Sequence, residues 1–380
     1  MKRIIFVIAI LICTFFNFNS VVISAESRDS EGITHIAEVV KSEFTENNAN
    51  SSVDSMLQLK QLVTVKFLKG EYKGEEVTIT NMITGNPAYD IITHSGDKLV
   101  IHQDAESENA FYISDIYRLP FMFVLIGLFA VLLIVVGKKK GLLSLLSIFI
   151  TCWLIFSCLS PMILHRVNPV FATTVICLIS TAITMYLVGG FNYKSTSAFL
   201  GTFISIIFAL ILSVITVIFA HITGFSNESC TYLFSSHPEL DLQSIAVSAI
   251  LLATLGAVMD VAMSVSSAIN EFYVINEVLS VKELFKSGMN VGKDIIGTMA
   301  NTLILVYLGG ALPLVLLSEN IDAQKFFNLN QIVTEVSAAL IGSITLLICV
   351  PVTAIISAVL IKMKKSKNSD IILKEKDDLL

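Results

Sequence analysis

The stretch IAVSAILLATLGAVMDVAMSVSSAINE, residues 245–271, is long and apolar enough to cross a bilayer as an α-helix, although it carries Asp260 in its interior. Other apolar runs of about 20 residues recur from Arg118 to the end of the chain. We therefore expect about seven transmembrane helices, at about residues 119–136, 141–164, 170–189, 197–220, 245–267, 297–317 and 333–361. Because 54% of the 380 residues are hydrophobic, composition alone also predicts a polytopic α-helical membrane protein.

The N-terminus has the order of an export signal. Lys2 and Arg3 precede an apolar run that ends in the small residues Ser24 and Ala25. This order predicts a signal peptide over residues 1–25, with an uncleaved N-terminal anchor as the alternative. Residues 26–59 are mostly polar and lack periodicity, so we expect a flexible exported segment there.

A small β-rich domain is predicted over residues 60–117. Runs rich in β-branched and aromatic residues occur at 61–70, 75–83, 98–103 and 110–116, separated by glycines and by a turn at Ser95–Asp97. They predict an exported antiparallel barrel or sandwich ahead of the helical bundle, which we place at residues 118–362. Sixteen acidic and seven basic residues lie between Glu26 and Asp115, and the whole chain has a net charge of −6. This balance argues against a nucleic-acid partner.

Lysine and arginine positions set the expected orientation, since cytoplasmic loops retain them. With the β-rich domain outside, the outer loops of the membrane region hold only Arg166 and Lys325. The inner loops and the tail hold Lys138, Lys139, Lys140, Lys194, Lys282, Lys286, Lys293, Lys362, Lys364, Lys365 and Lys367. We therefore expect a multi-pass plasma-membrane protein with an extracellular or periplasmic N-terminal domain and a cytoplasmic tail over residues 363–380.

Two polar stripes interrupt the apolar character of the fifth and sixth predicted spans. At helical spacing, one face of the fifth carries Gly256, Asp260, Ser264, Ser267 and Glu271, and one face of the sixth carries Asp294, Thr298, Asn301 and Thr302. One inner loop joins the two helices, so we expect the stripes to converge in an intramembrane patch. An aspartate in the centre of a bilayer costs about 2.5 to 3.5 kcal/mol, and such residues usually serve a function. A hydrogen-bonded clasp between helices is the alternative, and Glu335 is a weaker candidate site residue.

The inner loop between these spans has a helix start of its own. Ser280 and Glu283 form a capping-box pattern, which predicts a short helix stopped by Gly288. Leu284 and Phe285 are then expected to rest on the membrane, either in an interfacial helix or in a docking helix for a cytoplasmic partner such as an ATPase.

Several motifs together resemble one family of membrane proteins. They are LGAVMDVAMSVSSAINE (255–271), GKDIIGTMANTLILVYLGG (292–310), KGEEVTITN (73–81), YISDIYR (112–118), LSPMIL (159–164) and VPVTAIISA (350–358). In this combination the chain resembles the YibE/F family of bacterial multi-pass membrane proteins, from about residue 60 to residue 361. It departs from the family pattern at HRVNP (165–169), where a glycine is usual after the helix. The resemblance implies the membrane fold, and it implies no activity and no catalytic or binding residues.

The sequence leaves three functional hypotheses. It contains no P-loop, nucleophile elbow, H-E-x-x-H motif or Cys/His metal spacing, so no catalytic residue, metal or cofactor is predicted. The leading hypothesis is a permease that moves a small solute or ion through the polar patch. The alternatives are a non-transporting scaffold or sensor whose β-rich domain binds an envelope component, and a lipid-modifying intramembrane enzyme using Asp260 or Asp294. The expected partners are the lipid bilayer, a small solute or ion, and a second copy of the chain or a cytoplasmic protein.

Overall fold

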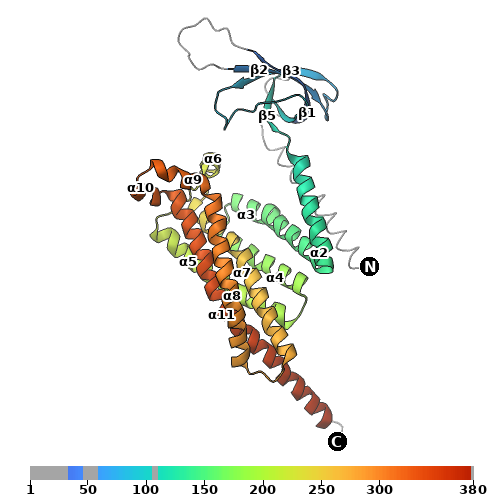
Figure 1. Ribbon diagram of the computed structural model, residues 1–380, viewed down its shortest axis with the longest axis vertical. Coiled ribbons are helices and arrows are strands. Elements are labelled where there is room, and N and C mark those ends of the chain that lie inside the picture. Colours follow the sequence, from blue (N-terminus) through green and yellow to red (C-terminus); the bar gives the residue numbers. More distant parts are fainter. Residues whose placement is uncertain (1–32, 46–58, 105–109, 378–380) are drawn as a thin grey trace. The chain divides into compact units, whose positions relative to one another are not determined.

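The computed structural model describes residues 33–45, 59–104 and 110–377 (Figure 1). The chain divides into two compact units between Gly137 and Lys138. The predicted signal peptide or anchor, residues 1–25, lies outside the described residues, as does part of the segment 26–59.

The first unit contains a five-stranded antiparallel sheet, which confirms the predicted β-rich domain (Figure 1). The strands follow the order β3-β2-β1-β4-β5. They are β1 (Ile33–Thr45), β2 (Leu59–Phe67), β3 (Glu76–Ile83), β4 (Lys98–Gln103) and β5 (Phe111–Ile116). The edge strands β3 and β5 also contact each other, so the sheet curls into a half-barrel around one apolar core.

Strand β1 is the central strand of this sheet, whereas the sequence predicts a flexible segment over residues 26–59. It pairs with β2 on one side and β4 on the other. Its side chains His35, Ala37 and Val39 are buried, at the two-residue spacing of a strand with one inner face. The prediction of flexibility is therefore wrong for β1. The inward face of β1 carries a histidine and an alanine in place of large apolar residues, so the sequence lacks the alternating apolar pattern that usually indicates a buried strand.

A buried glutamine holds the loop between β3 and β4 against the sheet. Gln61 Nε2 donates to the Thr93 carbonyl at 2.8 Å and to Ser42 Oγ at 2.8 Å. Its Oε1 accepts from the Thr93 backbone N–H at 3.3 Å. Nearby, Asn81 Nδ2 donates to the Ile91 carbonyl at 2.7 Å. Because a buried amide without partners is costly, these bonds fix the path of the loop.

After β5, the described residues are mainly helical. The helices are α2 (Leu119–Leu154), α3 (Ser160–Leu164), α4 (Pro169–Gly189), α5 (Tyr193–Phe219), α6 (Glu228–Ser236), α7 (Leu242–Ile275), α8 (Val281–Gly310), α9 (Leu312–Leu316), α10 (Ala323–Phe327) and α11 (Asn330–Asp377). A π-helical turn, Ile155–Leu159, joins α2 to α3, and a 3₁₀ turn, Leu317–Asn320, follows α9. Helix α11 continues into the segment expected as the tail.

Six helical segments of the described chain are long and apolar enough to cross a membrane, by length and composition. The first, Leu119–Leu164, contains two of the seven predicted spans. They are separated only at Lys138, whose φ of 50° and ψ of −127° are not helical. The other five segments overlap the other five predicted spans, but the segment at the sixth, expected at about 297–317, begins at Val281 and ends at Gly310.

Helices α4, α5, α7, α8 and α11 pack around a shared apolar core, with α7, α8 and α11 side by side (Figure 1). Helix α7 supplies Val258, Val261 and Val265, which are fully buried. Glycine allows close approach between neighbours: a Cβ added at Gly201 of α5 would collide with Thr353 of α11. Such contacts between small residues are typical of helices that pack within a bilayer.

Helix α8 starts as the sequence predicts but does not stop where the sequence predicts. The capping box is formed, with the Ser280 hydroxyl and the Glu283 carboxylate each bonded to the other residue's backbone N–H. The helix then runs through Gly288 to Gly310. Gly288 is a packing residue, since an added Cβ would collide with Ile269 of α7. Leu284 is fully buried in the bundle core, so the prediction that it rests on the membrane surface is wrong.

Candidate functional site

The polar stripe of α7 lies on the face opposite its packed side. Asp260, Ser264 and Glu271 are exposed, and Ser267 is half-buried. The packed side of α7 carries the buried Val258, Val261, Ala262, Val265 and Ile269. Since the bundle core is built from valine, isoleucine and alanine, these residues turn inward and carry the polar stripe outward.

The polar stripe of α8 is also exposed. It consists of Asp294, Thr298, Asn301 and Thr302, all with exposed side chains. The Thr298 hydroxyl donates to the Ile295 carbonyl at 3.0 Å and the Thr302 hydroxyl donates to the Thr298 carbonyl at 2.9 Å, so both are bonded within their own helix. The packed face of α8 instead carries Leu284, Gly288 and Gly292.

The expected convergence of the two stripes inside the bundle is therefore corrected. Helices α7 and α8 meet through apolar residues and glycine, as the fit of Ile269 against Gly288 shows. Across the part of the chain that the structure describes, none of the eight predicted side chains bonds to another. The stripes are real features of the two helices, but each faces away from the shared core.

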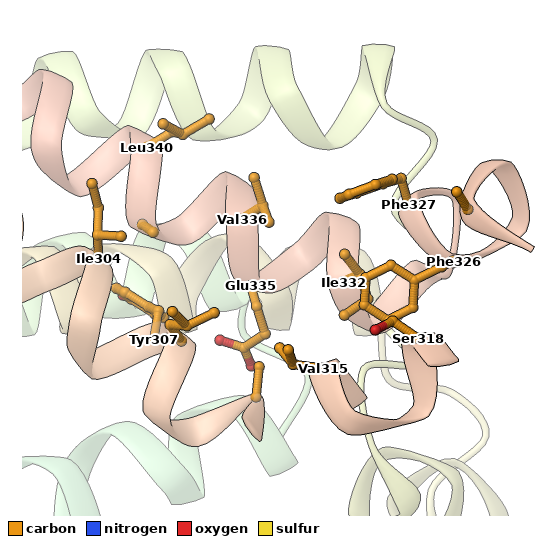
Figure 2. A pocket seen from close by; sticks show the side chains of 14 residues that line it. Ile304, Tyr307, Val315, Ser318, Phe326, Phe327, Ile332, Glu335, Val336 and Leu340 are labelled. Carbon is orange, nitrogen blue, oxygen red and sulfur yellow. The ribbon is translucent and has the colours of Figure 1, made fainter. Parts of the chain in front are cut away.

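A cavity lies elsewhere in the helical unit, and Glu335 is one of its lining residues. It has a volume of about 610 Å³ and an almost entirely apolar wall built by α8, α9, α10, the 3₁₀ turn and α11 (Figure 2). The lining residues are Ile304, Tyr307, Leu308, Ala311, Val315, Ser318, Ala323, Phe326, Phe327, Ile332, Glu335, Val336, Ala339 and Leu340. A cavity of this size falls in the range of pockets for small molecules.

Glu335 brings the only carboxylate to this wall. The side chain extends from α11 into the cavity, and Tyr307 of α8 and Val315 of α9 line the same region (Figure 2). The residue is half-buried. Among the residues that the structure describes, no side chain or backbone group makes a hydrogen bond or ion pair to it. Its charge therefore faces an apolar space with no protein partner.

Local bonds fix the elements around Glu335. Asn330, at the start of α11, donates through Nδ2 to the Phe225 carbonyl at 2.8 Å and accepts from the Thr223 backbone N–H at 3.2 Å. These bonds tie the first turn of α11 to the loop after α5. On the other side of the cavity, the Asp322 side chain caps α10 by accepting from the Gln324 backbone N–H at 3.0 Å. The first bonds anchor the start of α11, and the Asp322 cap fixes the start of α10.

The arrangement suits a ligand with an apolar body and a cationic or hydrogen-bond-donating group. A carboxylate in apolar surroundings is costly until a complementary group reaches it, and the aromatic residues offer faces to a cation or an apolar ring. No group of three or more histidine, cysteine, aspartate or glutamate residues that could hold a metal occurs in the described part of the chain.

The sequence marks Glu335 as a weaker candidate and does not point to the rest of the cavity. Tyr307 and Phe326 contribute to it from segments that lie before and after the α9 turn. The only sequence signal for them is the presence of aromatic residues at both ends of a short loop between two spans. Their meeting with Glu335 depends on how α8 and α11 pack.

The fold defines a helical membrane protein with a small N-terminal β half-barrel. Residues 125–363 match the family of YibE/F-like proteins, and residues 31–116 match the YibE/F family N-terminal domain. The chain therefore belongs to the YibE/F family, as its motifs predict. No curated protein and no solved structure matches it.

Proposed function

We propose that this protein is a plasma-membrane permease for a small amphiphilic cation, and that Glu335 is the carboxylate that binds the cationic group. The observation that carries the proposal is the cavity of about 610 Å³ in which one unpartnered carboxylate faces an apolar and aromatic wall. An ammonium or similar group beside Glu335 relieves the desolvation cost of the carboxylate, and the apolar wall accepts the rest of the solute.

The position of the cavity along the bundle supports entry from the exported side. Residues 311–329 contain α9, α10 and the turn between them, and the distribution of lysine and arginine supports an extracytoplasmic position for this loop. A solute reaching the cavity there would come from the outer leaflet or from the extracytoplasmic solution. The same distribution supports an exported β half-barrel and a cytoplasmic C-terminus.

The test uses ethidium, a flat apolar cation that fluoresces more strongly when it is bound. Binding to the purified full-length protein is compared between wild type, Glu335→Gln and Glu319→Gln, the last being a control on an exposed residue of the adjacent 3₁₀ turn. We expect roughly tenfold weaker binding for Glu335→Gln, or about 1.4 kcal/mol, and no change for the control. Ethidium flux into proteoliposomes should fall in Glu335→Gln and stay unchanged in Glu319→Gln.

Two results would remove parts of this proposal. Equal ethidium affinity of Glu335→Gln and Glu319→Gln excludes Glu335 as the binding carboxylate. Binding without flux in the wild-type protein excludes the permease and leaves a ligand sensor.

One observation favours the second candidate, a non-transporting scaffold or sensor. The polar stripes of α7 and α8 face out of the bundle, where they can join proteins together but cannot line a path through a single copy. The discriminating variant is Asp260→Asn. Unchanged flux in this variant separates the stripe from transport, whereas lost flux in a folded variant restores Asp260 to the transport path.

A further inference from the structure

Asp260 has no hydrogen-bond or ion-pair partner among the residues that the structure describes. It lies near the middle of α7, about 27 Å from Leu242 and about 22 Å from Ile275 at 1.5 Å per residue. Its side chain is exposed on the bundle surface, and no residue described in the structure makes a hydrogen bond or ion pair with it. Lipid tails cannot supply the missing donor, so the partner at this depth must be another polar group.

The exposed side-chain donor that α8 carries at a similar depth is Asn301. Helices α7 and α8 run antiparallel, because Ile269 lies against Gly288 while Thr254 and Leu303 both approach Gly342. This register places Asn301 about level with Gly256, one helical turn from Asp260. Side chains lean toward the N-terminus of their own helix, so in this antiparallel pair Asp260 and Asn301 lean toward the same level.

The surface around these two residues allows close approach. A Cβ added at Gly256 of α7 or at Gly297 of α8 would meet nothing within 4 Å. Ala253, one turn before Gly256, is also exposed. Small residues beside polar ones are the pattern by which helices associate in a bilayer.

The chain's first apolar helix offers no side-chain donor for Asp260. Residues 119–137, LPFMFVLIGLFAVLLIVVG, contain no hydroxyl, amide or charged side chain. A second copy of the chain, in contrast, brings both an acceptor and a donor. The hydroxyls of Thr298 and Thr302 are already bonded within α8, which leaves the Asn301 amide as the donor of the α8 stripe.

We propose that two copies associate through the exposed faces of α7 and α8, with Asp260 of each copy accepting a hydrogen bond from the partner's Asn301. In a twofold dimer whose axis runs along the helices, α7 of one copy faces α8 of the other. The Asp260 to Asn301 contact is then made twice, once from each copy to the other. This surface is separate from the Glu335 cavity and does not depend on the proposed transport.

The test is disulfide cross-linking in native membranes. Two differently tagged full-length chains, each with its six native cysteines replaced, are co-expressed, one with Gly256→Cys and the other with Asn301→Cys. One Asp260 to Asn301 contact of the twofold pair remains intact in this mixture. Mild oxidation should give a cross-linked pair carrying both tags. A control pair combines Gly256→Cys with Ile211→Cys, an exposed position on α5.

A second measurement tests the hydrogen bond itself. Asp260→Leu should lower the dimer fraction at least fivefold in single-molecule photobleaching in lipid, and the exchange Asp260→Asn with Asn301→Asp should restore it. Absence of the 256–301 cross-link, or equal yield from the control pair, would overturn the interface. Failure of the exchanged chain to dimerise while it remains folded would overturn the direct contact.

Discussion

Substitution of Gly288 by alanine tests the packing of α8 against α7. An alanine Cβ at this position would collide with Ile269, whose side chain is fully buried, and would also touch Ala354 of α11 at 3.5 Å. Overpacking a tight core usually costs about 1 to 3 kcal/mol, while replacing a helical glycine by alanine returns about 1 kcal/mol. We therefore expect a net loss of roughly 0 to 2 kcal/mol in the free energy of unfolding.

Gly297→Ala is the matched control, because it makes the same change on the same helix where nothing lies within 4 Å of the new Cβ. It should stabilise the protein by up to about 1 kcal/mol, so the two variants should differ by about 1 to 3 kcal/mol. The assay is unfolding of the full-length protein by SDS in mixed micelles, followed by fluorescence of Trp153, the single tryptophan, which packs within the bundle. Equal effects of the two substitutions would refute the claim that Gly288 is the contact point.

Three further predictions concern the hydrogen bonds of individual side chains. Gln61→Leu should destabilise the β half-barrel by about 1 to 3 kcal/mol, since the loop carbonyl that it serves stays buried, and faster proteolysis of the full chain within residues 84–97 would show it. The pKa of Asp90 is held below its usual value near 3.8 by hydrogen bonds from the Thr84 backbone and side chain. The ionised Asp90 therefore stabilises this turn above pH 3.8, and the stabilisation is lost as pH falls through the lower pKa of the folded state. Pepsin cleavage of the wild-type turn should rise over that pH range. The Asp90→Asn variant should show no such rise. Ser266→Ala should cost about 1 kcal/mol, because the Ser266 hydroxyl donates to the Lys194 carbonyl at 2.8 Å, and Ser267→Ala should cost less in the same SDS titration.

Each of these has an outcome that contradicts it. Wild-type proteolysis rates in Gln61→Leu would mean that the loop is held by other contacts. An acid step that persists in Asp90→Asn would assign it to another carboxylate. Equal losses of unfolding free energy in Ser266→Ala and Ser267→Ala would show that the hydrogen bond from Ser266 contributes nothing measurable to stability.

The local features of the sequence predict the elements well. Four of the five strands and the spans from α4 to α11 follow from β-branched runs and from apolar length, and the start of α8 follows from Ser280 and Glu283. Strand β1 is missed because its inward residues include His35 and Ala37, which carry little apolar signal. Gly288 is misread because a helical glycine marks either a stop or a close contact, and only the neighbour Ile269 distinguishes the two.

The candidate site shows the limit of periodicity. Helical spacing places Asp260 and Ser264 on one face of α7, and it places Asp294 and Asn301 on one face of α8, but it does not say what each face touches. The Glu335 cavity requires the end of α8, the turn around α9 and the start of α11 to meet. No short window of sequence contains that information.

The sequence by itself determined the class of protein, because hydrophobic length and strand alternation are local properties that a bilayer or a sheet reads directly. It also determined which residues carry charge into the membrane region, Asp260 and Glu335 among them. Only the tertiary structure decided the direction in which those charges point. Valine, isoleucine and glycine on α7 and α8 fill the space between the helices, so their polar stripes face outward, while the packing of α8 against α11 leaves Glu335 facing a cavity.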